Sequence, residues 1–203
     1  MGKKIYIIDD FYTNPDVIRE LAINADYNSG AKYNYPGYHS SKMYANKDVL
    51  KNRFEEIIKK EIRVEPNLFG SFRIMTKHSS VKTNVHLDLK NWAALVFLTP
   101  NPNLDCGLGI FRHKDTNFSS KPDDWECRKL GYEDFQEFEG EVIHKDKSNL
   151  DKWEMLTYVE PKYNRLALIR GDLLFHAGMN GFGENLEDSR ITHNFFFDEK
   201  MCK

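Results

Sequence analysis

Residues 85–89 read VHLDL and place His86 and Asp88 two positions apart in a stretch with the composition of a β-strand. In a strand, residues i and i+2 point to the same face of the sheet, so the imidazole and the carboxylate are expected to lie side by side. The other face would carry apolar side chains, namely Val85, Leu87 and Leu89. Because burial of an unpartnered carboxylate is costly, a cation between His86 and Asp88 would stabilise this arrangement, as would a simple Asp–His hydrogen bond.

A second histidine stands near the end of an apolar segment, GDLLFHAG, which covers residues 171–178. The segment predicts a Gly-Asp turn followed by a strand that reaches His176. In a jelly roll, strands that are distant in sequence can be neighbours, so His86, Asp88 and His176 are predicted to converge. Two histidines and one carboxylate form the facial triad of non-haem Fe(II) oxygenases, which leaves open positions on the metal.

A third motif, SRITHNFFF at residues 189–197, reads as another strand. Arg190 lies 14 positions after His176, and the two-residue period of a strand puts Arg190 and Thr192 on one face. A guanidinium fork with a neighbouring hydroxyl is suited to bind a carboxylate. His193 points to the opposite face, so it is not expected to be a metal ligand.

The first third of the chain predicts two helices that pack outside a sheet. Residues 4–12 have the pattern of a first strand, and residues 13–25 have that of a helix with Asn14 as its cap. Residues 47–63 form a second amphipathic pattern, with Ile62 among the side chains expected on its buried face.

From residue 67 onward the pattern changes to short segments rich in β-branched and aromatic residues, as is typical of strands. Residues 26–46, in contrast, read as an irregular loop. Residues 114–162 are polar and mixed in charge, with one helix expected at residues 150–159 (LDKWEMLTYV), and they read as a long excursion or lid. The order of elements predicts a mainly β protein with flanking helices (α+β): a double-stranded β-helix, or jelly roll, with its N-terminal helices packed outside.

Length and composition indicate a single domain over residues 1–203, with the insertion at about 114–162. The 29 Lys and Arg residues against 31 Asp and Glu give a formal net charge of −2, which argues against a nucleic-acid or membrane-surface binder. Three cysteines are too few for a disulfide framework, no apolar run is long enough to span a membrane, and the N-terminus lacks a signal-peptide pattern. These features favour a reducing compartment, and we expect a cytoplasmic protein.

Taken in order, HLD at residues 86–88, FHAG at residues 175–178 and SRIT at residues 189–192 resemble the motifs of the Fe(II)/2-oxoglutarate-dependent dioxygenase superfamily. That pattern is a His-x-Asp/Glu pair, a distal histidine and then a basic residue. The opening segment IIDDFYTNPDVIRELA, at residues 7–22, is similar to the start of prolyl-hydroxylase-like members. The resemblance covers most of the chain in element order, and three short motifs carry it.

The resemblance implies an enzyme in which His86, Asp88 and His176 bind Fe(II). The cosubstrate 2-oxoglutarate would chelate the iron and meet Arg190 through its C5 carboxylate, with Thr192 assisting, and O2 would take the remaining position. The implied reaction is oxidative decarboxylation of 2-oxoglutarate to succinate and CO2, coupled to hydroxylation of a substrate C–H bond. Asp88 favours hydroxylation, because family members that halogenate have a small residue in place of the carboxylate.

Candidate substrate residues flank the three motifs. They are Asn84, Trp92, Arg112 and Asn180, although Trp92 also suits the apolar core. The substrate itself is left open, since a protein side chain, a free amino acid and a small metabolite all fit, and the fold alone does not choose among them. The oligomeric state is also open.

Two other function classes fit the same pattern. One is a cupin-like metal enzyme that uses the triad without 2-oxoglutarate, for which Arg190 would not be needed to bind a cosubstrate. The other is a non-catalytic jelly roll with a binding or structural role, which would lack iron affinity and would not turn over 2-oxoglutarate.

Overall fold

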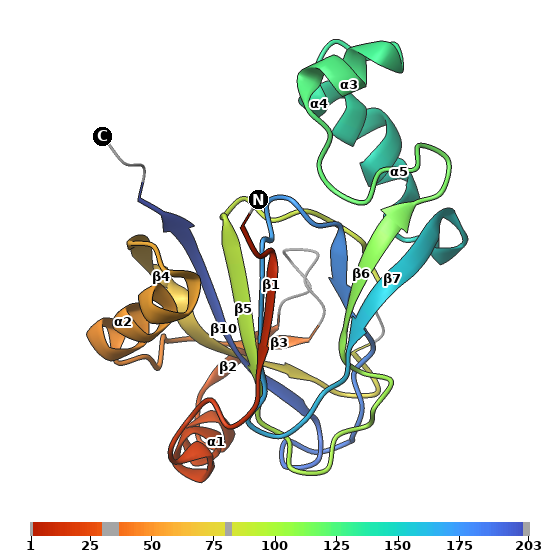
Figure 1. Ribbon diagram of the computed structural model, residues 1–203. Coiled ribbons are helices and arrows are strands. Elements are labelled where there is room, and N and C mark those ends of the chain that lie inside the picture. The colour runs from red at the N-terminus through yellow and green to blue at the C-terminus, as the bar shows by residue number, and fades with distance from the viewer. Residues whose placement is uncertain (1, 30–36, 80–82, 201–203) are drawn as a thin grey trace.

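The computed structural model describes residues 2–29, 37–79 and 83–200, and its strands form two sheets (Figure 1). The larger sheet contains, in hydrogen-bonded order, β1 (Ile5–Ile8), β8 (Leu166–Ile169), β5 (Trp92–Phe97), β10 (Arg190–Glu199), β4 (Ile62–Met75), β3 (Tyr38–Ser40) and β2 (Tyr27–Ser29). The smaller sheet contains β7 (Trp153–Val159), β6 (Leu108–His113) and β9 (His176–Gly178). Every strand pair in both sheets is antiparallel, and the arrangement confirms the predicted jelly-roll fold class.

An apolar cluster joins the two sheets on one side of the barrel interior. Leu108 and Ile110 of β6 pack in the same cluster as Ala167 and Ile169 of β8, whereas Phe111 of β6 belongs to a different cluster. This alternation follows from the two-residue period of a strand, in which successive side chains point to opposite faces. This cluster fills the part of the interior between β5, β8 and the smaller sheet with apolar side chains.

The helices α1 (Pro15–Ile23) and α2 (Lys47–Ile58) cover the outer face of the larger sheet (Figure 1). Phe54 of α2 is fully buried and contacts four other aromatic rings, those of Phe11, Phe69, Phe195 and Phe197. The N-terminal helices therefore pack outside the barrel, as predicted from their amphipathic patterns.

We expect Phe54→Ala to lower the free energy of unfolding by about 3–5 kcal/mol, because it leaves a cavity where five rings meet. Urea unfolding followed by circular dichroism measures the change. Val49→Ala on the same helix is the matched control, since Val49 is 61% exposed and its truncation leaves no cavity. Equal destabilisation by the two substitutions would contradict this packing.

The end of the second helix was predicted wrongly. Helix α2 stops at Ile58, where Lys59 adopts a left-handed conformation (φ 60°) and caps it, rather than continuing to residue 63. Ile62 is buried as expected, but it belongs to the start of β4. Asn14 does occupy the N-cap of α1, although its side chain makes no capping hydrogen bond.

The helix predicted at residues 150–159 is also wrong, because these residues form a 3-10 turn (Leu150–Lys152) followed by strand β7. β7 is an edge strand whose ends are buried and whose middle, Met155 and Leu156, is exposed. Pairing with β6 outweighs the helix-like spacing of the apolar residues. The loop expected at residues 26–46 likewise contains the short strands β2 and β3, and its residues 30–36 lie outside the described part of the chain.

Between β6 and β7, residues 114–152 project beyond the ends of both strands (Figure 1). This segment, the helical excursion, contains α3 (Asp124–Lys129), α4 (Phe135–Phe138), a π-helix (Glu139–Ile143) and α5 (His144–Asp146), in addition to the 3-10 turn. None of these helices was predicted. The longest helix in the described residues, α2, has 12 residues, and no described helix is long and apolar enough to cross a bilayer.

The helical excursion packs against the outer face of the smaller sheet. Phe138 and Ile143 share an apolar cluster with Val85 and Phe175, and the backbone N–H of Val85 donates to the carbonyl of Lys147 at 2.8 Å. Val85 and Phe175 directly precede His86 and His176 in the chain. The excursion thus supports both histidine segments from outside the barrel.

Candidate metal centre

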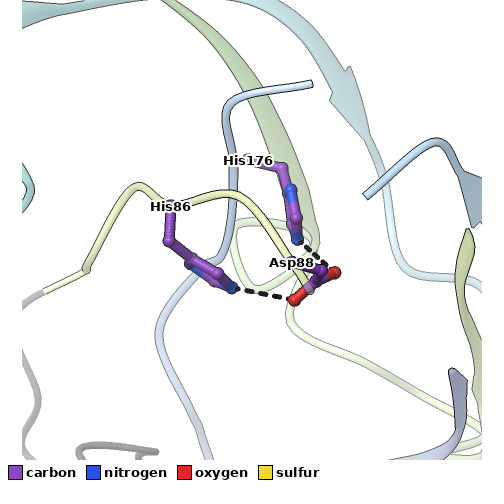
Figure 2. A group of neighbouring side chains, drawn as sticks. All are labelled: His86, Asp88 and His176. Atoms are coloured by element: carbon purple, nitrogen blue, oxygen red, sulfur yellow. Dashed lines mark ion pairs between the residues drawn. The ribbon is translucent and has the colours of Figure 1, made fainter. Parts of the chain in front are cut away.

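Three side chains from two distant segments point toward one another in the barrel (Figure 2). His86 Nε2 lies 3.6 Å from Asp88 Oδ1, and His176 Nε2 lies 3.1 Å from Asp88 Oδ2. One ligand atom from each of the three residues lies within 4.8 Å of the other two. The convergence predicted from the motifs is therefore present in the structure.

Backbone hydrogen bonds fix these segments. His86 and His176 form an isolated β-bridge, in which each backbone N–H donates to the other's carbonyl at 3.0 Å. Beyond the bridge, the N–H of Asp88 donates to the carbonyl of Gly171 at 2.8 Å. VHLDL is consequently not the regular strand we expected, because its pairing partner changes after His86. Leu89 is fully exposed rather than buried beside Val85.

The tautomers of both histidines follow from their backbone contacts. His86 Nδ1 lies 2.9 Å from the carbonyl oxygen of Asn84, and His176 Nδ1 lies 2.8 Å from that of Leu174. Because a carbonyl only accepts hydrogen bonds, each Nδ1 must carry the proton, and a neutral imidazole then presents the Nε2 lone pair toward Asp88. This is the arrangement typical of metal-binding histidines. The contribution of Asn84 comes from its backbone carbonyl.

The buried carboxylate of Asp88 favours the binding of a cation at this site. Asp88 Oδ2 is buried and accepts no hydrogen bond of acceptable geometry from the described residues. Burial raises the pKa of Asp88, but the neighbouring imidazoles of His176 and His86 outweigh it and hold that pKa below its usual value. Burial lowers the pKa of His176, and the charge of Asp88 outweighs it in turn, so the pKa of His176 is raised. A divalent cation bound between Asp88 and the two Nε2 atoms would neutralise the carboxylate in place of a proton on His176.

Close approach of the Asp88 carboxylate depends on Gly171. A Cβ atom at Gly171 would lie 2.4 Å from Asp88 Oδ2, which is far inside van der Waals contact. We expect Gly171→Ala to displace the carboxylate and to weaken metal binding roughly 10- to 100-fold, as is typical when a ligand is misplaced. Equilibrium dialysis with Ni(II) measures the affinity.

The matched control for this prediction is Gly140→Ala in the helical excursion. A Cβ atom at Gly140 meets nothing within 4 Å, so the substitution should leave Ni(II) binding unchanged. Wild-type affinity in Gly171→Ala would show that the position of the Asp88 carboxylate does not control metal binding.

Arg190 is a buried cation on the inner face of β10. Its side chain donates from Nε to the carbonyl of Cys106 at 2.6 Å and from Nη2 to the carbonyl of Gly107 at 3.3 Å, and Nη1 lies 3.5 Å from the sulfur of Met75. None of the ion pairs among the described residues includes Arg190. Burial lowers its pKa to about 10, so the group remains a cation at neutral pH.

The guanidinium lies beside β9, the strand that carries His176. A Cβ atom at Gly178 would be 3.8 Å from Arg190 Nη2, and Gly178 follows His176 by two positions in β9. At ~3.3 Å per residue, two positions on one face of a strand span roughly 7 Å. Thr192 follows Arg190 by the same spacing and is 1% exposed. The anchor residues predicted from the sequence are therefore buried on the same side of β10.

The remaining sequence candidates are not drawn into this cluster. Trp92 packs in the outer core beneath the N-terminal helices and donates from Nε1 to Glu199 Oε1 at 3.0 Å. It is therefore a core residue and does not face the cluster. Arg112 forms an ion pair with Glu154 of the neighbouring strand, and Asn180 is exposed. His193 lies on the outer face of β10, where its Nδ1 is 2.9 Å from the hydroxyl of Tyr12, as expected for a residue that is not a ligand.

Sequence reasoning missed a second group of possible ligands, formed by His113, Asp115 and Asp146. His113 Nε2 lies 3.0 Å from Asp146 Oδ2, and Nδ1 lies 3.0 Å from the hydroxyl of Thr116. Because both ring nitrogens of His113 already have partners, we interpret this group as a structural contact that links β6 to α5. His113 and Asp146 are far apart in the sequence, so no short motif indicated that they would meet.

Comparison with family models gives one match, a family of unknown function designated DUF6445, over residues 1–197. The chain belongs to this family. A comparison with curated proteins found no match for this DUF6445 member.

Solved structures resemble the DUF6445 chain over nearly its whole length. HygX from Streptomyces hygroscopicus, with nickel, 2-oxoglutarate and hygromycin B bound, has a TM-score of 0.55 and 13% identity, covering 98% of this chain and 84% of that one. A prolyl hydroxylase from Trichoplax adhaerens, in complex with a hypoxia inducible factor peptide fragment, has a TM-score of 0.50 and 11% identity, covering 96% and 83%. The DUF6445 member therefore has the fold of the 2-oxoglutarate-dependent dioxygenases.

Proposed function

We propose that this protein is an Fe(II)- and 2-oxoglutarate-dependent dioxygenase that hydroxylates a C–H bond. The observation that carries the proposal is the pairing, within one barrel, of a His-Asp-His cluster with a buried guanidinium. A metal site alone would also fit a cupin-like enzyme or a binding protein. The guanidinium adds a site for an anionic group beside Gly178, two positions after His176 in β9.

His86 Nε2, His176 Nε2 and one oxygen of Asp88 would hold the metal. The Nδ1 hydrogen bonds to the carbonyls of Asn84 and Leu174 fix both imidazole rings, so the ligand set is ordered before the metal binds. Two nitrogens and one carboxylate oxygen suit Fe(II) and leave coordination positions for other molecules. The His86 side chain is 40% exposed, which leaves the cluster accessible from that side.

The guanidinium of Arg190 would bind the C5 carboxylate of 2-oxoglutarate. An arginine has five N–H donors, and the contacts with Cys106, Gly107 and Met75 engage three of them, which leaves two for a ligand. A buried cation without a counter-ion is costly, so a dicarboxylate that supplies one is strongly favoured. Thr192 lies on the same face of β10 and would add a hydroxyl to this site.

When bound, Fe(II) supplies the activation of O2 that couples decarboxylation of 2-oxoglutarate, with release of succinate and CO2, to oxidation of the substrate. The protein residues bind and orient the reactants. The apolar cluster formed by Leu108, Ile110 and their neighbours excludes water from one side of the interior. Asp88 would supply a carboxylate ligand to the metal, which favours hydroxylation over halide transfer.

The substrate is proposed only as a class: a protein side chain, an amino acid or a small metabolite. The similar structures were solved with hygromycin B and with a peptide fragment, and both kinds of ligand are compatible with this class. We further propose that residues 1–203 fold as one domain with an insertion, or lid, at about 114–162.

The proposal is tested by turnover of 2-oxoglutarate. Purified protein with Fe(II), 2-oxoglutarate, ascorbate and O2 should release succinate slowly even without a substrate, and an amino acid or peptide that is hydroxylated should accelerate the release. Protein stripped of metal with a chelator should release none. Release that does not require the metal, or its complete absence in iron-loaded protein, would contradict the proposed activity.

A further inference from the structure

The hydroxyl of Tyr158 forms hydrogen bonds with both ends of a loop, and two backbone carbonyls of this loop accept hydrogen bonds from Arg190. Tyr158 lies in β7, and its hydroxyl donates to the carbonyl of Leu104 at 2.5 Å. The same oxygen accepts from the backbone N–H of Gly107 at 2.7 Å. One phenol thus bridges both ends of residues 104–107, which we call the anchor loop.

The anchor loop holds Arg190 through its backbone. The carbonyls of Cys106 and Gly107 accept from Nε and Nη2 of Arg190. The Gly107 carbonyl also accepts from the N–H of Met179 at 3.0 Å, which ties the loop to the end of β9. The orientation of the guanidinium therefore depends on where two peptide groups of this loop lie.

The loop has no room to relax toward β7. A Cβ atom at Gly107 would lie 2.1 Å from the carbonyl oxygen of Val159 and 2.9 Å from the ring of Tyr158. Burial raises the pKa of Tyr158, which keeps the phenol protonated and able to donate to Leu104. The backbone of Gly107 is consequently pressed against the Tyr158 ring and hydrogen-bonded to its hydroxyl.

We propose that Tyr158 is a positioning residue that sets the orientation of Arg190 and, through it, the affinity for the distal carboxylate of 2-oxoglutarate. The inference rests on the proposed function. Tyr158 makes no hydrogen bond with the guanidinium in the described structure, so it acts through the anchor loop. Its sequence position gave no indication of this role, since the segment was expected to be helical.

The test is Tyr158→Phe, which removes one oxygen and keeps the ring. Binding of 2-oxoglutarate and of 2-oxopentanoate to the Ni(II)-loaded protein is measured by calorimetry. Both compounds carry the same chelating end, and only 2-oxoglutarate has a distal carboxylate. We expect the Kd of 2-oxoglutarate to rise about 5- to 30-fold, as for loss of a buried hydrogen-bonding group. The Kd values of 2-oxopentanoate and of Ni(II) should stay unchanged and report an intact fold.

Tyr163→Phe is the matched control, because the Tyr163 hydroxyl donates to Asp16 on the surface at 2.5 Å and not to a group of the anchor loop. An unchanged Kd of 2-oxoglutarate in Tyr158→Phe would overturn the inference, as would equal weakening of both 2-oxo acids. Failure of the wild-type protein to bind 2-oxoglutarate would instead overturn the proposed function itself, and the role of Tyr158 with it.

Discussion

Replacement of Asp88 by alanine is expected to abolish measurable binding of Fe(II) and Ni(II). The carboxylate is the only anionic group in the cluster, and both imidazoles point their Nε2 atoms toward it. Without it, two neutral nitrogens remain, and the affinity should fall by more than about 100-fold, beyond the effect of changing a supporting residue. Equilibrium dialysis of the purified variant measures the loss.

Asp115→Ala provides the matched control for this prediction. Asp115 belongs to the second group of possible ligands, where it is exposed and paired with Lys152 at 2.6 Å. The variant should bind one metal ion with wild-type affinity. Loss of the metal in Asp115→Ala together with its retention in Asp88→Ala would move the metal site to the excursion and refute the assignment.

Replacement of Arg190 by leucine should separate cosubstrate binding from metal binding. A buried guanidinium that pairs with a carboxylate contributes about 2–4 kcal/mol to affinity, so the Kd of 2-oxoglutarate should rise roughly 30- to 700-fold. The Kd of Ni(II) should change little, because Arg190 contacts none of the three ligand side chains. Calorimetric titration of each ligand gives the two values independently.

Arg112→Leu is the control for Arg190→Leu. The sequence marked both arginines as candidate binding residues, but Arg112 is 36% exposed and its guanidinium is ion-paired with Glu154. Its replacement should leave the Kd of 2-oxoglutarate unchanged. Unchanged binding of 2-oxoglutarate in Arg190→Leu would favour a metal enzyme that uses the triad without this cosubstrate.

The predictable part of the site consists of residues linked by local rules. The alternation of a strand placed Arg190 and Thr192 on one face and His193 on the other, and β10 bears this out. The spacing of His86 and Asp88 also proved sufficient to bring them together, although the backbone there forms one bridge rather than a strand. In both cases the signal lies within a few residues.

What the sequence did not predict depends on partners far along the chain. Residues 153–159 have apolar spacing that suits a helix, and only pairing with β6 makes them a strand. Gly171 is required by the carboxylate of Asp88, which lies 83 positions earlier. Tyr158 acts on a loop more than 50 positions away. No local pattern encodes such contacts, since they arise from the register of one sheet against the other.

The most direct test is an anaerobic titration of the wild-type protein with Fe(II) and then 2-oxoglutarate, followed by visible absorption. We predict a weak charge-transfer band that requires both components, saturates at one Fe(II) per chain, and is absent in Asp88→Ala. A band that persists in Asp88→Ala, or wild-type protein that shows none when both components are present, would contradict a ferrous site built from His86, Asp88 and His176.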